Sequence, residues 1–531
     1  MAVRSFLLVL LIYGVEAPAS PFPKIKELMQ FLNFTPYYES PFNGREVKIA
    51  ILDNGFRGYE NEISVTLPPS TKYHKGPLAP EGEEESHGLV MAQLVTALMT
   101  NDFTTEKIPY SLHLLSAAGY TNLAAAVKTV VEEKYDVVLY AQTWEYGGNF
   151  DGRGFINTLV NKAIEKGDTL WINAAGNFGL NSFNFAIQFA EDSWVHFPNK
   201  GYALHVRCET NLAGRCPLRA VLSWSDFSDD VETGTEKDLD FYLQDESGKT
   251  VGKSELQQKK EISEKEKNQE QISKYPREVI EADVKSGIYF LRVKAKTRNF
   301  SSRDRLRVTV SGNGVSLLQR DIDESLPIPA DNSRVVTVGA SDSDISSRSK
   351  TLDKPDIFAP SRITIENYLQ VQGTSMSAAI VAAGAAILKS VYADMTMEKF
   401  LKFTRNHGLI GAPQIGNGLA LAVLQFAPTG PGCFIPVGSF QLQGAVVVMT
   451  SVGQKVFVFY DPIKLLNGKT RHRPEDMIVY GPRGYELQPR LMQLQLQMQN
   501  QIEVVQVPNG QVICGQNLNA SSKIFRMPRI R

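Results

Sequence analysis

The chain has 531 residues, of which 43% are hydrophobic and 21% are charged, and its formal net charge at pH 7 is −1. This length allows about two to four domains, and the composition is that of a globular protein with a large core, which excludes a disordered or fibrous chain. A net charge near zero, without a basic run interleaved with aromatic residues, argues against a nucleic-acid partner.

The N-terminus has the pattern of a secretory signal peptide over residues 1–20. Arg4 precedes the apolar run 5–15, and Ala17-Pro18-Ala19-Ser20 supplies small residues for cleavage. This run is too short to cross a bilayer, so we predict a secreted or periplasmic protein with no membrane span after processing. The alternative is a buried N-terminal strand. Residues 21–45 form a polar and aromatic lead.

From residue 47 onward, predicted strands and helices alternate along the chain. The predicted strands cover residues 47–52, 112–117, 136–140 and 169–173, and the predicted helices cover residues 89–99, 123–133 and 155–166. This alternation indicates an α/β fold with a doubly wound parallel sheet. Such sheets bind ligands at the carboxyl ends of their strands, so we expect a functional site at this edge.

Four polar residues should converge on that edge. Asp53 and Asn177 each follow a predicted strand, while His87 and Ser375 each open a predicted helix. Free backbone N–H groups and the helix dipole stabilise negative charge at the start of a helix, which suits a nucleophilic oxygen. A hydroxyl, an imidazole and a carboxylate can form a nucleophilic serine system, and an amide can bind the oxyanion. Each residue alone could be a cap or a turn residue, but the four together favour catalysis.

The local sequences around these residues resemble those of the subtilisin-like serine peptidases (subtilases, family S8). Four motifs carry the resemblance: Ile51-Leu52-Asp53-Asn54-Gly55, Ser86-His87-Gly88, Ala174-Ala175-Gly176-Asn177 and Gly373-Thr374-Ser375-Met376-Ser377. The resemblance implies a subtilisin-like catalytic domain in which Asp53, His87 and Ser375 are the catalytic triad and Asn177 is the oxyanion-hole donor. The lead of residues 21–45 is short for the folding propeptide of such enzymes.

The chain departs from the family pattern near these motifs. Asn54 stands where the family usually has Thr or Ser, and Ala379 stands where a Pro usually follows the nucleophile. The strand that would bind substrate, residues 138–143, lacks the usual Ser-x-Gly ending. Tyr140 and Gln142 are therefore predicted to be substrate-binding residues that crowd or reshape the cleft, and a narrow substrate range is expected.

The stretch between Asn177 and Ser375 is longer than the few strand–helix units needed to connect them. Over residues 192–323 the pattern changes to short strands, and residues 238–243 and 287–293 resemble the jelly-roll domains often attached to secreted peptidases. We predict an inserted all-β, jelly-roll domain that divides the catalytic domain into residues 46–191 and 324–428. The alternative is a set of extended surface loops.

The inserted region also contains a group of carboxylates that could bind a metal ion. Oxygen ligands of this type are those that Ca²⁺ prefers. The candidate ligands are Asp226, Asp229, Asp230, Asp238 and Asp240. The alternative is a solvated acidic loop, since no EF-hand spacing is present.

A Pro- and Gly-rich linker at residues 428–432 precedes the C-terminal region. Residues 429–531 are rich in strand patterns, and residues 494–499 alternate apolar and polar side chains as a half-buried strand does. We predict a small C-terminal β domain that binds a substrate or a surface, or that stabilises the protein.

Four cysteines in an exported chain suggest disulfide bonds. Their grouping favours Cys208–Cys216 and Cys433–Cys514 among the three possible pairings, and unpaired buried thiols are the alternative.

The predicted function is hydrolysis of peptide bonds in protein or peptide substrates by a secreted serine endopeptidase. The resemblance implies that Ser375 attacks the carbonyl carbon, His87 transfers the proton, and no cofactor is required, although structural Ca²⁺ is an option. We expect a monomer. The alternatives are a catalytically silent binding protein on the same scaffold, and an esterase or transpeptidase that uses the same acyl-enzyme.

Overall fold

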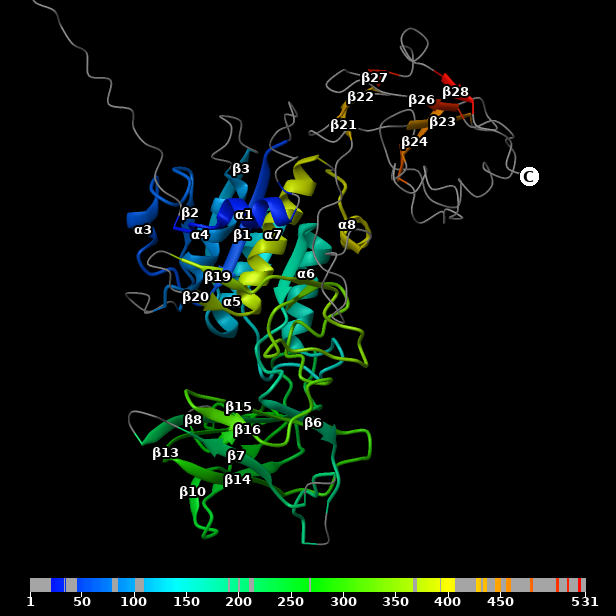
Figure 1. The fold of residues 1–531 in the computed structure, drawn as a ribbon. Coiled ribbons are helices and arrows are strands. Elements are labelled where there is room, and N and C mark those ends of the chain that lie inside the picture. Colours follow the sequence, from blue (N-terminus) through cyan, green and yellow to red (C-terminus); the bar gives the residue numbers. More distant parts are fainter. Residues whose placement is uncertain are drawn as a thin grey trace, which may run out of the picture.

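The structure is a computed structural model. It describes residues 21–32, 34, 45–78, 85–100, 109–189, 192–198, 201–209, 214–266, 269–365, 370–391 and 393–405, together with short strands between residues 426 and 526. Figure 1 shows the arrangement of these elements.

A seven-stranded sheet forms the centre of the first unit. Its order is β18-β17-β5-β4-β1-β3-β2, and every neighbouring pair is parallel. The strands are β1 (Val47–Asp53), β2 (Lys72–His74), β3 (Tyr110–Ser116), β4 (Val137–Tyr140), β5 (Leu170–Ala174), β17 (Val336–Ala340) and β18 (Ile357–Ala359). This arrangement confirms the predicted α/β fold with a parallel sheet.

Helices cover both faces of this sheet. The helices on one face are α1 (Ile25–Phe31), α4 (His87–Met99) and α7 (Thr374–Val391), and those on the other are α5 (Gly119–Glu133) and α6 (Phe155–Gly167). Along β1 the side chains alternate between the two cores: Ile49 and Ile51 pack with α4 and α7, while Ala50 and Leu52 pack with α5 and α6. Two further helices are α3 (Tyr59–Glu62) and α8 (Met397–Arg405).

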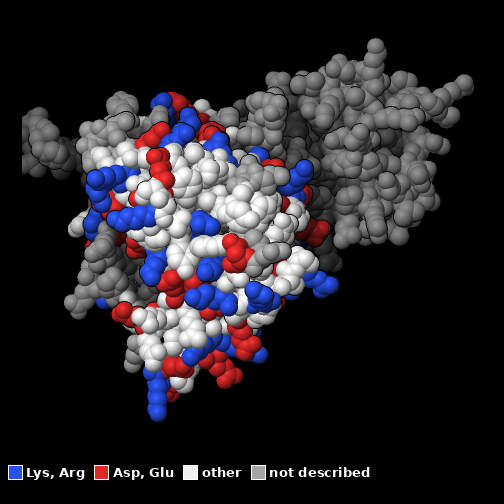
Figure 2. All heavy atoms as spheres, turned by 90° about the horizontal axis from the view of Figure 1, so that it is seen from below, with Lys and Arg blue, Asp and Glu red and all other residues white. Residues whose placement is uncertain are grey.

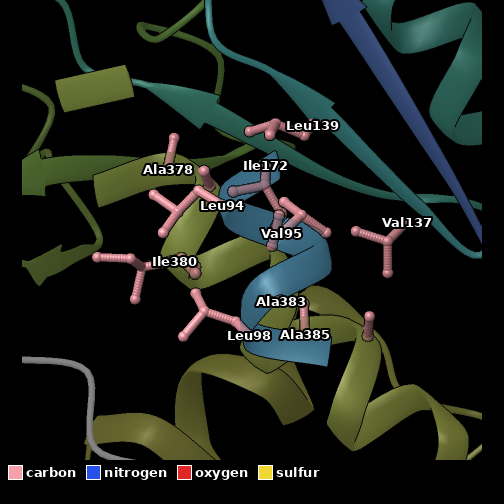
Figure 3. Close-up of a cluster of buried hydrophobic side chains, with 14 of the residues drawn as sticks. Leu94, Val95, Leu98, Val137, Leu139, Ile172, Ala378, Ile380, Ala383 and Ala385 are labelled. Atoms are coloured by element: carbon pink, nitrogen blue, oxygen red, sulfur yellow. The ribbon is translucent and has the colours of Figure 1, made fainter. Parts of the chain in front are cut away.

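Small residues let α7 lie close to the sheet and to α4. Ala378 and Ala383 of α7 are fully buried, as is Leu94 of α4. Figure 3 shows them clustered with side chains of β4 and β5. Each fully buried Leu or Ile contributes about 1.5–3 kcal/mol of transfer free energy, so this cluster firmly fixes the start of α7 relative to the strand ends.

The lead that precedes β1 belongs to the same core. Phe22, Ile25, Met29, Leu32 and Phe34 are all at most 6% exposed and pack with α4 and α7. Helix α1 is therefore part of the folded unit and not a loosely attached extension.

Between β5 and β17 the chain forms two antiparallel sheets that enclose a second hydrophobic core. One sheet has the order β13-β8-β15-β6 and the other has the order β10-β9-β14-β7-β16. Their strands are β6 (Ser182–Ala186), β7 (Leu204–Cys208), β8 (Arg215–Trp224), β9 (Leu239–Gln244), β10 (Thr250–Ser254), β13 (Arg277–Lys285), β14 (Gly287–Ala295), β15 (Arg305–Ser311) and β16 (Val315–Leu317).

Of the two antiparallel sheets, the one with the order β13-β8-β15-β6 lies nearer to the parallel sheet (Figure 1). The β structure begins with β6, before the predicted boundary at residue 192. A separate two-stranded sheet is formed by β11 (Gln257–Gln258) and β12 (Ile272–Ser273), which lie between β10 and β13 in the sequence. Two further short strands, β19 (Arg362–Thr364) and β20 (Gln370–Gln372), form a hairpin just before α7.

The predicted disulfide between Cys208 and Cys216 is present, with a Cα–Cα distance of 6.0 Å. It joins the end of β7 in one sheet to β8 in the other. The second predicted bridge lies outside the described side chains, although Cys433 and Cys514 are backbone partners in neighbouring strands.

The C-terminal strands form two small antiparallel sheets. One contains β21 (Phe426–Gly430), β22 (Cys433–Pro436) and β27 (Ile513–Cys514); the other contains β23 (Ala445–Met449), β24 (Lys455–Phe459), β25 (Ile478–Tyr480), β26 (Glu503–Val505) and β28 (Ile524–Arg526). The predicted signal peptide, residues 1–20, and the predicted strand at residues 494–499 lie outside the described residues. In the described part of the chain no helix has the length and apolar character needed to span a membrane.

Charged side chains of both signs are interspersed over the face seen in Figure 2. This distribution agrees with the formal net charge of −1.

Candidate active site

Asp53 and His87 are in direct contact. Asp53 is the last residue of β1 and His87 is the first residue of α4. The imidazole Nδ1 lies 3.0 Å from Asp53 Oδ1 and 2.9 Å from Asp53 Oδ2. The Asp53 side chain is fully buried, whereas the His87 side chain is 34% exposed. Because Nδ1 is directed at the carboxylate, Nε2 is the ring nitrogen available to a reacting group.

Gly55, which follows β1, and Gly88, in the first turn of α4, allow β1 and α4 to approach each other closely. The N–H of Gly88 donates to the carbonyl of Gly55 at 2.9 Å, and the N–H of Arg57 donates to Glu85 at 3.0 Å. A Cβ atom at Gly88 would lie 2.7 Å from Asp53 Cβ, closer than real Cβ atoms pack. The glycine after His87 is therefore required for the contact between β1 and α4.

Two opposing effects set the pKa of His87. Burial disfavours the imidazolium and on its own lowers this pKa. The hydrogen bond to Asp53 and the charge of Asp53 raise it, and Glu85 adds a further negative charge. The net result is a pKa of His87 above its usual value of 6.5.

Ser375 is the second residue of α7 and is 9% exposed. Its hydroxyl donates a hydrogen bond to the carbonyl oxygen of Ala141 at 3.0 Å. Ala141 directly follows β4, the strand that pairs with β1 on the side away from β3. Ser375 therefore lies at the same sheet edge as Asp53, with its proton directed at Ala141 and not at His87.

The Asn177 side chain is oriented by the residue before Ser375. Asn177 Oδ1 accepts hydrogen bonds from the N–H of Thr374 at 3.0 Å and from its hydroxyl at 3.1 Å. The hydroxyl of Thr374 in turn accepts the N–H of Gly176 at 3.0 Å. Because Oδ1 takes both Thr374 donors, Nδ2 is the end of the amide that can donate to an oxyanion.

Gln142 contacts the acid–imidazole pair, a contact that the sequence did not predict. Its Nε2 donates to Asp53 Oδ1 at 2.9 Å and lies 3.1 Å from His87 Nδ1. The missing Ser-x-Gly ending was the only sequence signal that this position is unusual.

Tyr140, the other residue predicted to bind substrate, lies in the core. It is 1% exposed, and its hydroxyl accepts a hydrogen bond from Trp144 Nε1 at 2.7 Å. Its ring packs edge-on against Trp171. The structure thus places this side chain under the strand end and not on the surface of a cleft.

The five predicted calcium ligands do not come together as a metal site. Asp226 Oδ1 lies 2.9 Å from Lys237 Nζ, and Asp229 accepts the N–H of Gly154 at 2.8 Å. Within the described ranges, no group of three or more His, Cys, Asp and Glu side chains is placed to hold a metal ion. A lysine at a carboxylate and backbone donors do not fit a Ca²⁺ site, so calcium is not assigned to these residues.

Part of the sequence matches a known peptidase family. Residues 251–408 match the family model described as the subtilase family, Peptidase_S8. Over this part of its length the chain is similar to subtilases. The matched part of the chain contains Ser375 and all of α8 but neither Asp53 nor His87.

Two curated relatives are also similar to this chain. Proprotein convertase subtilisin/kexin type 4 of Mus musculus is 24% identical over 234 residues, which cover 40% of this chain and 34% of that protein. The protein of the same name from Rattus norvegicus is 24% identical over 40% of this chain and 33% of its own length. The chain therefore matches about a third of the length of these relatives.

Among solved structures, the Clostridium perfringens CspB protease aligns with a TM-score of 0.46 at 13% identity, covering 75% of this chain and 96% of that chain. The epidermin leader peptide processing serine protease EpiP from Staphylococcus aureus aligns with a TM-score of 0.38 at 12% identity, covering 77% and 82% of the two chains.

Proposed function

We propose that this protein is a secreted serine endopeptidase that hydrolyses peptide bonds through an acyl-enzyme. The observation that carries the proposal is the contact of His87 Nδ1 with both oxygens of the buried Asp53 carboxylate. Ser375, at the start of α7, and the amide of Asn177 lie at the same edge of the sheet. Together they supply a nucleophile, a base with its orienting acid, and an oxyanion donor.

In this mechanism the Ser375 hydroxyl turns from the Ala141 carbonyl and gives its proton to Nε2 of His87 as Oγ attacks the peptide carbonyl carbon. Asp53 holds the ring and stabilises the imidazolium that forms. Asn177 Nδ2 and the N–H of Ser375 would bind the oxyanion. His87 then protonates the leaving amine. In the second half of the reaction, His87 takes a proton from water as the water attacks the acyl-enzyme, and it returns the proton to Ser375 Oγ as the carboxylic acid product leaves. All of these groups belong to the chain, so the proposal includes no cofactor.

We propose that the two antiparallel sheets between β5 and β17 are a jelly-roll module inserted into the catalytic domain, and that the C-terminal sheets are a separate β domain. An oxidising compartment is supported by the Cys208–Cys216 disulfide, because such bonds persist mainly outside the cytosol. The proposed substrates are proteins or peptides, and the proposed form is a monomer.

Labelling with a fluorophosphonate probe tests the proposal. We expect the wild-type protein to be labelled and the Ser375→Ala and His87→Ala variants to remain unlabelled. Ser390→Ala is a matched control, because Ser390 is a buried serine of the same helix whose hydroxyl bonds only locally to Ile387 at 2.7 Å. A mixed peptide library analysed by mass spectrometry would then show whether peptide bonds are cut, and an added amine acceptor would separate hydrolysis from transpeptidation.

A catalytically silent binding protein is the second candidate. The hydrogen bond from Ser375 to Ala141 favours it, because a hydroxyl committed to a carbonyl is not activated by His87. A folded wild-type protein that takes no label would support this candidate and contradict the endopeptidase proposal.

A further inference from the structure

We propose that Gln142 is a positioning residue of the candidate site: its side-chain amide shares the Asp53 carboxylate with His87 and thereby sets the pH range in which His87 acts as a base. The role as a base rests on the proposed function, whereas the effect on the titration of His87 does not.

The contacts of Asp53 give the first argument. Its Oδ1 atom accepts hydrogen bonds from the N–H of Asn54 at 2.8 Å and from Gln142 Nε2 at 2.9 Å, in addition to the 3.0 Å contact with His87 Nδ1. Its Oδ2 atom has the 2.9 Å contact with His87. The carboxylate is fully buried, so these donors replace water as the groups that stabilise its charge.

The position of Gln142 in the chain gives the second argument. Gln142 directly follows Ala141, whose carbonyl accepts the Ser375 hydroxyl, and its own carbonyl lies 3.4 Å from Asn173 Nδ2 at the end of β5. One short segment after β4 thus contacts the acid, the imidazole and the nucleophile. A residue held at both its backbone and its side chain is well suited to fix the orientation of a neighbour.

The chemistry of an amide gives the third argument. Gln142 is neutral, so it stabilises the Asp53 carboxylate without gaining or losing a proton near pH 7. Each donor that Asp53 receives elsewhere reduces the net stabilisation that the carboxylate offers to an imidazolium. The charged groups that act on His87 are Asp53 from β1 and Glu85 from the loop before α4. By donating to Asp53, the Gln142 amide reduces the stabilisation that this carboxylate gives to the His87 imidazolium.

Two substitutions of Gln142 should raise the pKa of His87 by different amounts. Gln142→Met keeps the length of the side chain but removes the donor, so Asp53 depends more on His87 and the pKa of His87 rises. Gln142→Glu replaces the donor with a second carboxylate beside His87, which raises that pKa further. We expect shifts on the order of half a unit and about one unit, respectively.

The experiment is a pH titration of the His87 ring resonances by NMR, assigned through their loss in His87→Ala. It is run on the wild-type protein, on both Gln142 variants and on Gln93→Met as a control. Gln93 lies on α4 with His87, and its amide donates to Thr66 Oγ1 at 3.0 Å, so its loss removes a comparable bond away from Asp53. The expected order of pKa values for His87 is wild type and Gln93→Met, then Gln142→Met, then Gln142→Glu.

Activity provides the second readout. A base must be neutral to accept a proton, so a higher pKa of His87 moves the acidic limb of the kcat/KM profile to higher pH. The acidic limb should move in the same order as the NMR titration. If either Gln142 variant raises KM while the titration of His87 and the acidic limb stay in place, Gln142 is a substrate-contacting residue and the proposal is wrong.

The two proposals fail in different ways. If the wild-type protein takes no fluorophosphonate label but His87 titrates in the expected order, the endopeptidase proposal fails and the positioning role stands. If the wild-type protein is active and the titration does not move, only the positioning role fails. Gln142→Glu is nearly isosteric with the native residue, so it decides the question even where Gln142→Met folds poorly.

Discussion

At the scale of single residues, the side chain of Asn177 forms hydrogen bonds with Thr374, the residue before Ser375 and the first residue of α7. The side-chain oxygen of Asn177 accepts two hydrogen bonds from Thr374, and the Thr374 hydroxyl accepts one from Gly176. In this arrangement Oδ1 makes structural hydrogen bonds, and Nδ2 is the end of the amide for which we propose the oxyanion contact. The two roles of Asn177 can therefore be separated by mutating its partner.

Asn177→Ala should lower kcat by about 10²–10³, equivalent to about 3–4 kcal/mol, with little change in KM, because an oxyanion donor acts mainly in the transition state. Steady-state kinetics on a peptide substrate would measure this loss. Thr374→Val is the control, since it removes the hydroxyl but keeps the Asn177 amide, and it should cost less than tenfold. An equal loss in both variants would assign the effect to the loop geometry and not to the oxyanion.

At the scale of secondary structure elements, the apolar face of α1 packs in the core of the parallel-sheet unit. Met29 is 2% exposed and packs in the same core as α4 and α7, whereas Gln30 on the same helix is exposed. The cap residues of α1 make no side-chain capping bonds. Burial of the apolar face is thus the main source of stability for a helix of this length.

Met29→Ala should lower the free energy of unfolding by about 2–5 kcal/mol, because it removes buried methylene groups and leaves a cavity. Urea denaturation followed by circular dichroism would measure the change, with Gln30→Ala as an exposed control on the same helix. We also expect residues 21–34 to remain attached in the mature protein, since a cut after Phe34 would remove buried side chains. A Met29→Ala variant as stable as the control would show that α1 is not part of the cooperative core.

At the scale of the whole molecule, the parallel sheet and the meeting of Asp53 with His87 could be predicted from the sequence. Both depend on backbone rules: strands that alternate with helices pair in parallel, and their carboxyl ends share an edge. The contact of Gln142 with Asp53 could not be predicted, because it depends on a side chain that reaches from the segment after β4 to the end of β1. The contacts of Asp226 with Lys237, and the burial of Tyr140, likewise depend on tertiary packing that local pattern does not encode.

The two units of this molecule are joined through a partly buried carboxylate, Glu145, in the loop after β4. Its side chain, 12% exposed, forms an ion pair with Arg219 of β8 and accepts a hydrogen bond from Thr309 of β15 at 2.6 Å. Its backbone carbonyl accepts the Ser223 hydroxyl at 2.9 Å. The sheet that contains β8 and β15 thus holds the loop that follows Gln142, so a change in this sheet should reach the candidate site.

Arg219→Met should destabilise the protein by about 1–3 kcal/mol, because it leaves the Glu145 carboxylate with fewer donors in a partly buried site. It should also raise KM, since the loop after Gln142 loses an anchor. Arg215→Met is the matched control on the same strand: its partner Asp283 is 59% exposed, and exposed ion pairs contribute only about 0–1 kcal/mol. Calorimetry and steady-state kinetics on both variants would measure the two effects. Equal behaviour of the two variants would mean that the antiparallel sheets between β5 and β17 and the candidate site are energetically independent.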